Sequence, residues 1–201
     1  VNSNLFYMRY KDQLVLSGAL NDVGAPLREN VGDSYRLGIE IDAQWQLSKR
    51  WMWQPNISLS DHRNIDSYFK RDGALTALGN TQIAFSPRLI AGQLLQYSPN
   101  ANLSLGLLHK QVGKQYMGNI NSEASVLKGY GQTDISTQYS WQPSHTFKSI
   151  SLQLLVNNVF NNLYVSNGYF FTYDDDFSSP GTVTTIEGSG YYPQAGTNFL
   201  L

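Results

Sequence analysis

The sequence predicts an all-β protein, specifically a transmembrane antiparallel β-barrel, and three observations support this fold class. Polar and apolar residues alternate along segments of strand length, which is typical of strands that face lipid on one side and a wet lumen on the other. Short connections between these segments alternate with long ones. Tryptophan and tyrosine residues gather near the short connections, as they do at a membrane boundary.

Eight strands are expected from this alternation, at approximately 4–16, 34–47, 51–63, 81–97, 102–116, 130–142, 149–172 and from 191 to the end. The connections near 48–50, 98–101 and 143–148 are predicted to be tight turns. Those near 17–33, 64–80, 117–129 and 173–190 are rich in Gly, Asn and Asp and are predicted to be long loops. Pro55 and Pro87 fall inside predicted strands, where each removes a ladder donor, so both are expected to mark irregular pairing.

The second segment gives the clearest separation of two faces. Its apolar set is Tyr35, Leu37, Ile39, Ile41, Ala43, Trp45 and Leu47, and its polar set is Arg36, Glu40, Asp42, Gln44 and Gln46. The sixth and seventh segments repeat the pattern, with Ile135 and Leu152 on their apolar sides. Because successive side chains of a strand point to opposite faces, one face is expected to contact membrane lipid and the other water.

Aromatic residues near the short turns are predicted to form a girdle at the membrane interface. The set is Trp45, Trp51, Trp53, Tyr97, Tyr139 and Trp141. Indole and phenol rings favour the headgroup boundary because one edge is apolar and the other can form a hydrogen bond. The alternative is that these rings belong to the core of a soluble sandwich or of a lipocalin-like barrel, since soluble antiparallel sheets alternate too.

Two groups of polar residues are candidates for function. The long connection 173–190 carries three successive carboxylates beside aromatic rings, and residues 61–72 carry mixed charge. The ligand-binding candidates are Asp174, Asp175, Asp176, Tyr173, Phe177, His62 and Arg63. The lumen candidates, which are predicted to point inward, are Glu40, Asp42, Arg88, Lys110 and Asp134. Solvation of an acidic loop and of a polar lumen is the alternative for both groups. Three successive carboxylates could coordinate a hard cation such as calcium, but consecutive aspartates lack the ligand spacing of an EF-hand, so no metal site is predicted.

Several function classes are disfavoured. A net charge of −1 offers no basic field for nucleic acid, and the chain has no cysteine and no apolar run long enough for a spanning helix. The chain has no nucleophile elbow, phosphate-binding glycine loop or metalloprotease motif, so neither an enzyme nor a cofactor is expected. His62, His109 and His145 fall on different segments and suggest no shared site. A hydrolase assembled from distant Ser, His and Asp remains an alternative.

Three segments, in order, carry a resemblance to a known family. They are VGKQYMGN at 112–119, VNNVFNNLY at 156–164 followed by SNGY at 166–169, and YYPQAGTNF at 191–199. These segments resemble the C-terminal barrel of TonB-dependent outer-membrane receptors. Two positions depart from the family pattern. Gly118 stands where an acidic residue is expected, and the chain ends at Leu201 without the usual terminal aromatic residue, so the last strand is expected to be cut short.

The resemblance implies more than the periodicity does. Residues 1–201 would be the C-terminal eight strands of a barrel of twenty-two, in the outer membrane of a Gram-negative bacterium. The lumen candidates would contact a plug domain, and TonB would bind through an N-terminal part that this chain lacks. The receptor would bind and import a scarce nutrient, such as an iron chelate, a vitamin, a glycan or a peptide. A complete eight-stranded barrel with a structural or adhesive role is the alternative.

Overall fold

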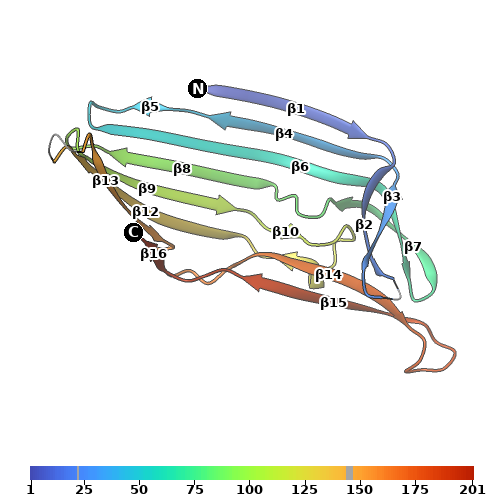
Figure 1. Ribbon diagram of the computed structural model, residues 1–201. Coiled ribbons are helices and arrows are strands. Elements are labelled where there is room, and N and C mark those ends of the chain that lie inside the picture. The colour runs from blue at the N-terminus through green and yellow to red at the C-terminus, as the bar shows by residue number, and fades with distance from the viewer. Residues whose placement is uncertain (22, 144–146) are drawn as a thin grey trace.

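The computed structural model describes residues 1–21, 23–143 and 147–201, and its main element is one long antiparallel sheet (Figure 1). Eight strands follow one another in chain order across this sheet. They are β1 (Asn2–Tyr10), β4 (Ser34–Asp42), β6 (Trp51–Arg71), β8 (Leu89–Tyr97), β9 (Leu103–Val112), β12 (Tyr130–Trp141), β13 (Ile150–Asn157) and β16 (Asn198–Leu200). Two shorter strands, β5 (Trp45–Gln46) and β7 (Ala74–Gln82), also pair with β6. The prediction of eight antiparallel strands is therefore confirmed.

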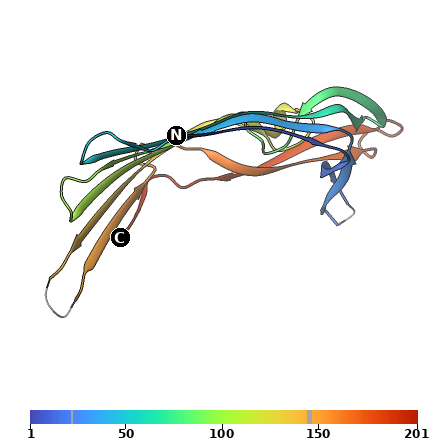
Figure 2. The same ribbon diagram turned by 90° about the horizontal axis from the view of Figure 1, so that it is seen from above.

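The sheet is curved and open (Figure 2). Strands β1 and β16 form its two edges, and no pairing joins them in the part of the chain that the structure describes. The eight strands therefore do not close on themselves, which does not support the alternative of a complete eight-stranded barrel. Within the described ranges, no helix is long and apolar enough to cross a membrane.

The prediction of long loops is wrong in part, because most of the connections predicted as loops contain strands. Connection 17–33 holds the hairpin β2 (Gln13–Leu20) and β3 (Pro26–Val31), and β6 runs on past residue 63 to pair with β7. Connection 117–129 holds a 3₁₀ turn, η1 (Glu123–Ser125), and β11 (Val126–Leu127), which pairs with β10 (Gln115–Tyr116). The last hairpin is β14 (Val165–Asp175) with β15 (Thr184–Pro193). Pairing satisfies backbone groups that a bare loop would leave to water.

Five of the predicted strands are broken in the structure, at 11–12, 43–44, 83–88, 113–114 and 158–164. The segment 81–97 is interrupted at 83–88, where Phe85 has a φ of 52° and Pro87 lies outside any strand. Pro55 stays within β6 opposite Gln93, but the ladder on its other side stops at 43–44. Both prolines therefore mark irregular pairing, as expected. The tight turn predicted at 143–148 lies partly outside the described residues.

The predicted strand 149–172 is also two strands, separated at 158–164. Asn158 and Asn161 have φ values of 51° and 52°, in the left-handed region that asparagine tolerates better than most residues. The Asn158 side chain is 1% exposed. Its Nδ2 donates to the carbonyl oxygens of Asn162 at 2.9 Å and Ala195 at 3.2 Å, and its Oδ1 accepts from the Asn162 amide at 3.0 Å. This turn, here called the asparagine latch, ties the end of β13 to the segment before β16.

The strand register confirms that the sheet has one apolar and one polar face. Ile57 pairs with both Ile41 and Ala91, and Ile135 pairs with Leu107, so their side chains share a face. Large aliphatic residues on this face are exposed, including Leu5, Leu37, Ile41, Leu59, Leu107, Ile135 and Leu152. A soluble protein rarely exposes so large an apolar patch, whereas a membrane strand presents one to lipid. The alternative of a soluble sandwich core therefore lacks support.

Buried side chains gather toward the end of the sheet that carries the hairpins. Apolar Ile83, Met117 and Leu127 are buried there, together with the polar residues Asn64 and Thr81. Asn64 Nδ2 donates to Thr81 Oγ1 at 3.2 Å, which joins β6 to β7. The small core thus supports the hairpins, while the rest of the sheet has no covering layer in the part described.

Candidate functional site

Hairpins β2–β3, β6–β7 and β14–β15 meet at the end of the sheet opposite the tight turns, and we call them the rim (Figure 1). Thr172 of β14 pairs in parallel with Ala19 of β2, which makes a four-stranded sheet of β15, β14, β2 and β3. The amide of Asp72 donates to Thr185 Oγ1 at 2.7 Å, and the Thr185 amide donates to Asp72 Oδ1 at 2.7 Å. These contacts dock three hairpins that are far apart in the sequence.

The carboxylate of Glu187 adds a further connection within the rim. Arg71 of the β6–β7 hairpin donates to it from one side, and the Ser122 hydroxyl donates to it from the loop before η1. Glu187 therefore joins β15 to two neighbouring connections. A carboxylate that accepts charged and neutral donors together holds such segments in a defined arrangement.

A cavity of about 540 Å³ lies between the rim hairpins. It has charged residues of both signs and three rings. Its charged and aromatic lining residues are Arg28, Glu29, Lys70, Asp174, Tyr68, Phe69 and Tyr173. A concave site that combines rings with a few charges can hold a small polar ligand and fix its orientation.

The three successive aspartates do not act together. Asp174 lines the cavity, where its Oδ1 accepts from Thr185 Oγ1 at 2.9 Å and its Oδ2 lies 3.7 Å from Lys70 Nζ. Asp175 turns the other way, and its Oδ1 accepts from the amides of Phe177 and Ser178 at 3.1 Å each. Among the described residues, no group of three or more His or acidic side chains is placed to hold a metal ion. Asp176 and Phe177, which is 92% exposed, do not line the cavity.

The Asp175 turn is expected to depend on pH. The Ser178 hydroxyl, the Ser178 amide and the Phe177 amide all donate hydrogen bonds to the Asp175 carboxylate. These bonds hold the pKa of Asp175 below its ordinary value. The turn is therefore complete above that ordinary pKa and is lost as the pH falls through the lowered one. Backbone hydrogen exchange at 177–178, corrected for the intrinsic rate, should show protection at pH 7 that is lost as the pH falls through the lowered pKa of Asp175. Asp175→Ala should abolish the protection at pH 7, whereas Asp176→Asn should leave both the protection and its pH dependence unchanged.

The placement of His62 and Arg63 in a loop is wrong, because β6 runs through both residues, whereas ligand contact by them stays a prediction. Both belong to β6, and their side chains point to opposite faces. The His62 ring stacks on Phe6 with ring centroids 6.5 Å apart, on the polar face. Arg63 Nε lies 3.1 Å from Asp61 Oδ1, on the apolar face. Alternation within β6 separates the two residues.

The prediction that the Arg88 side chain points into the lumen is also wrong. Its Nε lies 3.3 Å from Asp61 Oδ1, and Asp61 pairs with Leu37, so the Arg88 side chain lies on the apolar face. Arg88 directly follows the irregular connection, and the alternation of β8 does not extend back to it.

The other four lumen candidates occupy the polar face. Asp42 Oδ2 accepts from Asn2 Nδ2 at 2.8 Å, and Glu40 accepts from Asn4 Nδ2 at 3.3 Å. Lys110 is exposed opposite Gly92 and Gln132. Asp134 Oδ1 accepts from Gln132 Nε2 and from the Asn158 amide, both at 2.8 Å, so it supports the asparagine latch.

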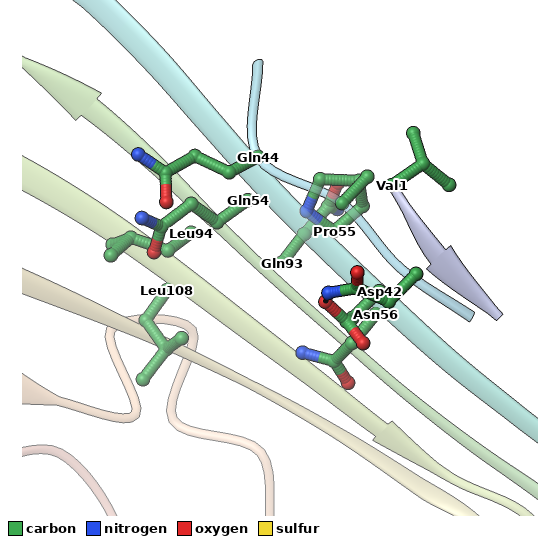
Figure 3. Close-up of a pocket in the computed structure, with 11 residues that line it drawn as sticks. Val1, Asp42, Gln44, Gln54, Pro55, Asn56, Gln93, Leu94 and Leu108 are labelled. Carbon is green, nitrogen blue, oxygen red and sulfur yellow. Dashed lines mark hydrogen bonds between the residues drawn. The ribbon is translucent and has the colours of Figure 1, made fainter. Parts of the chain in front are cut away.

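An open cavity of about 550 Å³ lies beside Asp42. Figure 3 shows Asp42 there with Gln44, Gln54, Asn56 and Leu108. The lining is mixed, and six of its eleven residues carry an amide or carboxylate group, so this part of the face can form hydrogen bonds with whatever lies against it.

The six aromatic residues predicted at the membrane interface lie at the end of the sheet that carries the tight turns. Trp45 stacks on Trp53 with centroids 5.9 Å apart, and Trp51 stacks on Tyr97 at 4.5 Å. Tyr139 and Trp141 form a third pair at 5.5 Å. The rings therefore form a band across several strands.

The histidines that the structure describes do not form a catalytic or metal-binding pair. His62 contacts Phe6, and His109 Nδ1 lies 2.9 Å from Thr133 Oγ1. His145 lies outside the described residues. Neither contact brings together a nucleophile, a base and an acid.

Sequence reasoning identified Tyr173 and Asp174 but missed Arg28, Glu29 and Phe69 as cavity residues. A local signal was available for the β6–β7 hairpin, because the pair Asp72-Gly73 stands between two strand-like segments. Both residues have positive φ, at 51° and 76°, as a two-residue hairpin turn requires.

Comparisons with known proteins agree with this geometry. The family model described as TonB dependent receptor-like, beta-barrel matches residues 1–159. No curated protein matches the sequence.

Three solved structures are similar in fold to nearly the whole chain. The ferric-catecholate import receptor Fiu of E. coli K12 has a TM-score of 0.64 at 17% identity, and the match covers 98% of this chain and 24% of the Fiu chain. The ferric yersiniabactin uptake receptor FyuA of Yersinia pestis has a TM-score of 0.62 at 19% identity, covering 98% and 26%. The copper transporter OprC has a TM-score of 0.67 at 18% identity, covering 98% and 27%. This chain thus spans about a quarter of their lengths.

Proposed function

Because this chain belongs to the TonB-dependent receptor-like β-barrel family, we propose that it is part of an outer-membrane receptor that binds and imports a scarce nutrient. The observation that carries the proposal is one curved sheet with an exposed apolar face, a polar face and a rim of hairpins at one end. In this arrangement the apolar face contacts lipid, the tight turns face the periplasm and the rim faces the cell exterior.

The rim cavity is the proposed place of first contact with the nutrient. Its charges of both signs and its rings suit an iron or other metal chelate, a vitamin, a glycan or a peptide. The names of the similar receptors mention ferric siderophores and copper, which favours a metal chelate among these.

The polar face is the proposed contact surface for a plug domain supplied by another part of the protein. Glu40, Asp42 and Lys110 are exposed on it, and charged side chains in a wet lumen can form polar contacts that are readily exchanged. TonB would act through that other part, and the complete barrel would have twenty-two strands in the outer membrane of a Gram-negative bacterium. The interface aromatics would mark the periplasmic membrane boundary.

Lys70→Glu in the full-length protein is expected to lower nutrient uptake about tenfold or more, because it reverses a cavity charge beside Asp174 and a charged hydrogen bond contributes about 1.5–3 kcal/mol. Uptake of radiolabelled ferric catecholate, ferric hydroxamate and copper chelates is measured in cells with and without TonB. Lys49→Glu, in a tight turn, is the matched control and should leave uptake unchanged.

Uptake that is equal with and without TonB would contradict the receptor function. Uptake that requires TonB but is the same for Lys70→Glu and Lys49→Glu would contradict the rim cavity as the binding site. Boiled and unboiled samples of each variant should migrate differently on gels, which establishes that the barrel is folded.

A further inference from the structure

Two arginines and one aspartate form a compact cluster on the apolar face, next to the rim. Arg63 Nε lies 3.1 Å from Asp61 Oδ1 and 3.2 Å from Asp61 Oδ2. Arg88 Nε lies 3.3 Å from the same Oδ1, and the Tyr35 hydroxyl donates to Oδ2 at 2.9 Å. We call Asp61, Arg63 and Arg88 the outer arginine cluster. Two guanidinium groups against one carboxylate leave one positive charge in excess.

The cluster faces the same way as the aliphatic side chains of the sheet. Asp61 pairs with Leu37 and Arg63 pairs with Tyr35, so all four side chains lie on the face that carries Leu59. Tyr35 also stacks on Tyr7, with centroids 6.4 Å apart. Charged side chains on a lipid-facing surface are costly at the membrane centre but not near its boundary.

The height of the cluster matches that boundary. From Trp51 to Asp61, β6 advances about ten residues, or about 33 Å at ~3.3 Å each. At a strand tilt of ~40° this is about 25 Å across the membrane, which is the height of the apolar band of an outer-membrane barrel. With Trp51 at the periplasmic boundary, the outer arginine cluster reaches the headgroups of the outer leaflet.

An open groove of about 640 Å³ joins the cluster to the apolar face. Leu5, Leu37, Ile39, Leu59 and Leu89 line it, and Asp61 and Arg88 lie at its charged end. The Arg88 side chain is 62% exposed, so its remaining N–H groups are accessible. A groove with aliphatic walls and a cationic end has the chemistry of an acyl chain that carries an anionic head.

We propose that this surface binds a phosphorylated acyl lipid of the outer leaflet, with an acyl chain in the groove and a phosphate on Arg63 and Arg88. The proposal rests on the proposed function, because it requires the apolar face to contact lipid. Arginine suits phosphate because its planar guanidinium donates two parallel hydrogen bonds, and Asp61 holds both arginines in place. The bound lipid would fix the rim side of the barrel at a set depth.

Native mass spectrometry of the full-length protein in detergent tests the proposal with three probes. They are a phosphorylated disaccharide lipid with several acyl chains, the same lipid without its phosphates, and inorganic phosphate. We expect the phosphorylated lipid alone to remain bound. Arg63→Gln with Arg88→Gln should weaken binding of the phosphorylated lipid about tenfold or more, because glutamine cannot form the charge-assisted hydrogen bonds of a guanidinium group to phosphate. Arg50→Gln removes one guanidinium charge at a tight turn and should have no effect.

Equal binding of both lipids would overturn the phosphate contact, and equal binding by the double variant and Arg50→Gln would overturn the site. Retention of inorganic phosphate without lipid would mean a site for a free anion, which also overturns the proposal. Nutrient uptake is measured separately in the same variants, so failure of lipid binding is distinguished from failure of the receptor function. The gel mobility of unboiled samples checks that each variant is folded.

Discussion

Ile135→Arg should lower the free energy of unfolding of the full-length barrel by about 2–4 kcal/mol, which is the usual cost of arginine on the lipid face near the membrane midplane. Ile135 is 41% exposed on the apolar face and pairs with Leu107 and Val156. It lies about six residues from Trp141 along β12, which is about 15 Å from the interface at ~3.3 Å per residue and ~40° tilt. The urea midpoint in lipid vesicles measures the effect.

Gln138→Arg is the matched control, because it adds the same side chain to the polar face of the same strand. Gln138 is exposed and pairs with Ser104 and Gln153. Arginine there meets water, so the urea midpoint should change little. If Gln138→Arg lowered the midpoint as much as Ile135→Arg does, the assignment of the apolar face to lipid would be wrong.

The period-two pattern was sufficient to predict the sheet and its two faces. Glu40, Asp42, Ile41 and Ile135 lie on the faces that alternation assigns to them, because strand geometry alone decides which way each side chain points. Arg88 shows the limit of this reasoning. It follows an irregular connection, where counting by twos across a left-handed residue such as Phe85 no longer gives the face.

The rim was less predictable than the sheet. Tyr173 and Asp174 were identified by composition, but Arg28 and Phe69 join them only because hairpins distant in the sequence dock together. That docking depends on pairs such as Thr172 with Ala19 and Asp72 with Thr185. No local pattern encodes such contacts, so the strands of the rim were interpreted as loops and the cavity between them was missed.

The asparagine latch was recognised by resemblance, whereas its physical role was not. Residues 149–172 continue the strand-like pattern through 158–164, so alternation predicts one strand. The break is set by backbone conformation, since Asn158 and Asn161 both have positive φ. The segment that carries the family resemblance therefore has a structural role, which is to tie the end of β13 to the segment before β16.

Asn158→Ala should lower the free energy of unfolding by about 3 kcal/mol or more. It removes the side chain that satisfies two carbonyl groups and one amide within a buried turn, and each unsatisfied buried group costs about 1–3 kcal/mol. Alanine also adopts the left-handed conformation about 1–2 kcal/mol less readily. The urea midpoint of the full-length barrel measures the loss. Hydrogen exchange at 158–164 and 195–197 should rise together, because Asn158 connects the two segments.

Two further variants separate the hydrogen bonds from the backbone strain. Asn158→Gly relieves the strain but restores no hydrogen bond, so it should recover only about 1 kcal/mol of the loss. Asn161→Ala has the same strain, and its side chain is exposed and accepts from the amide of Thr197 at 3.1 Å, so its total effect should be smaller, at about 1–2 kcal/mol. Full recovery of the free energy of unfolding in Asn158→Gly would mean that backbone conformation alone maintains the turn. Equal losses in Asn158→Ala and Asn161→Ala would likewise contradict the latch, because burial of the Asn158 amide is what distinguishes the two positions.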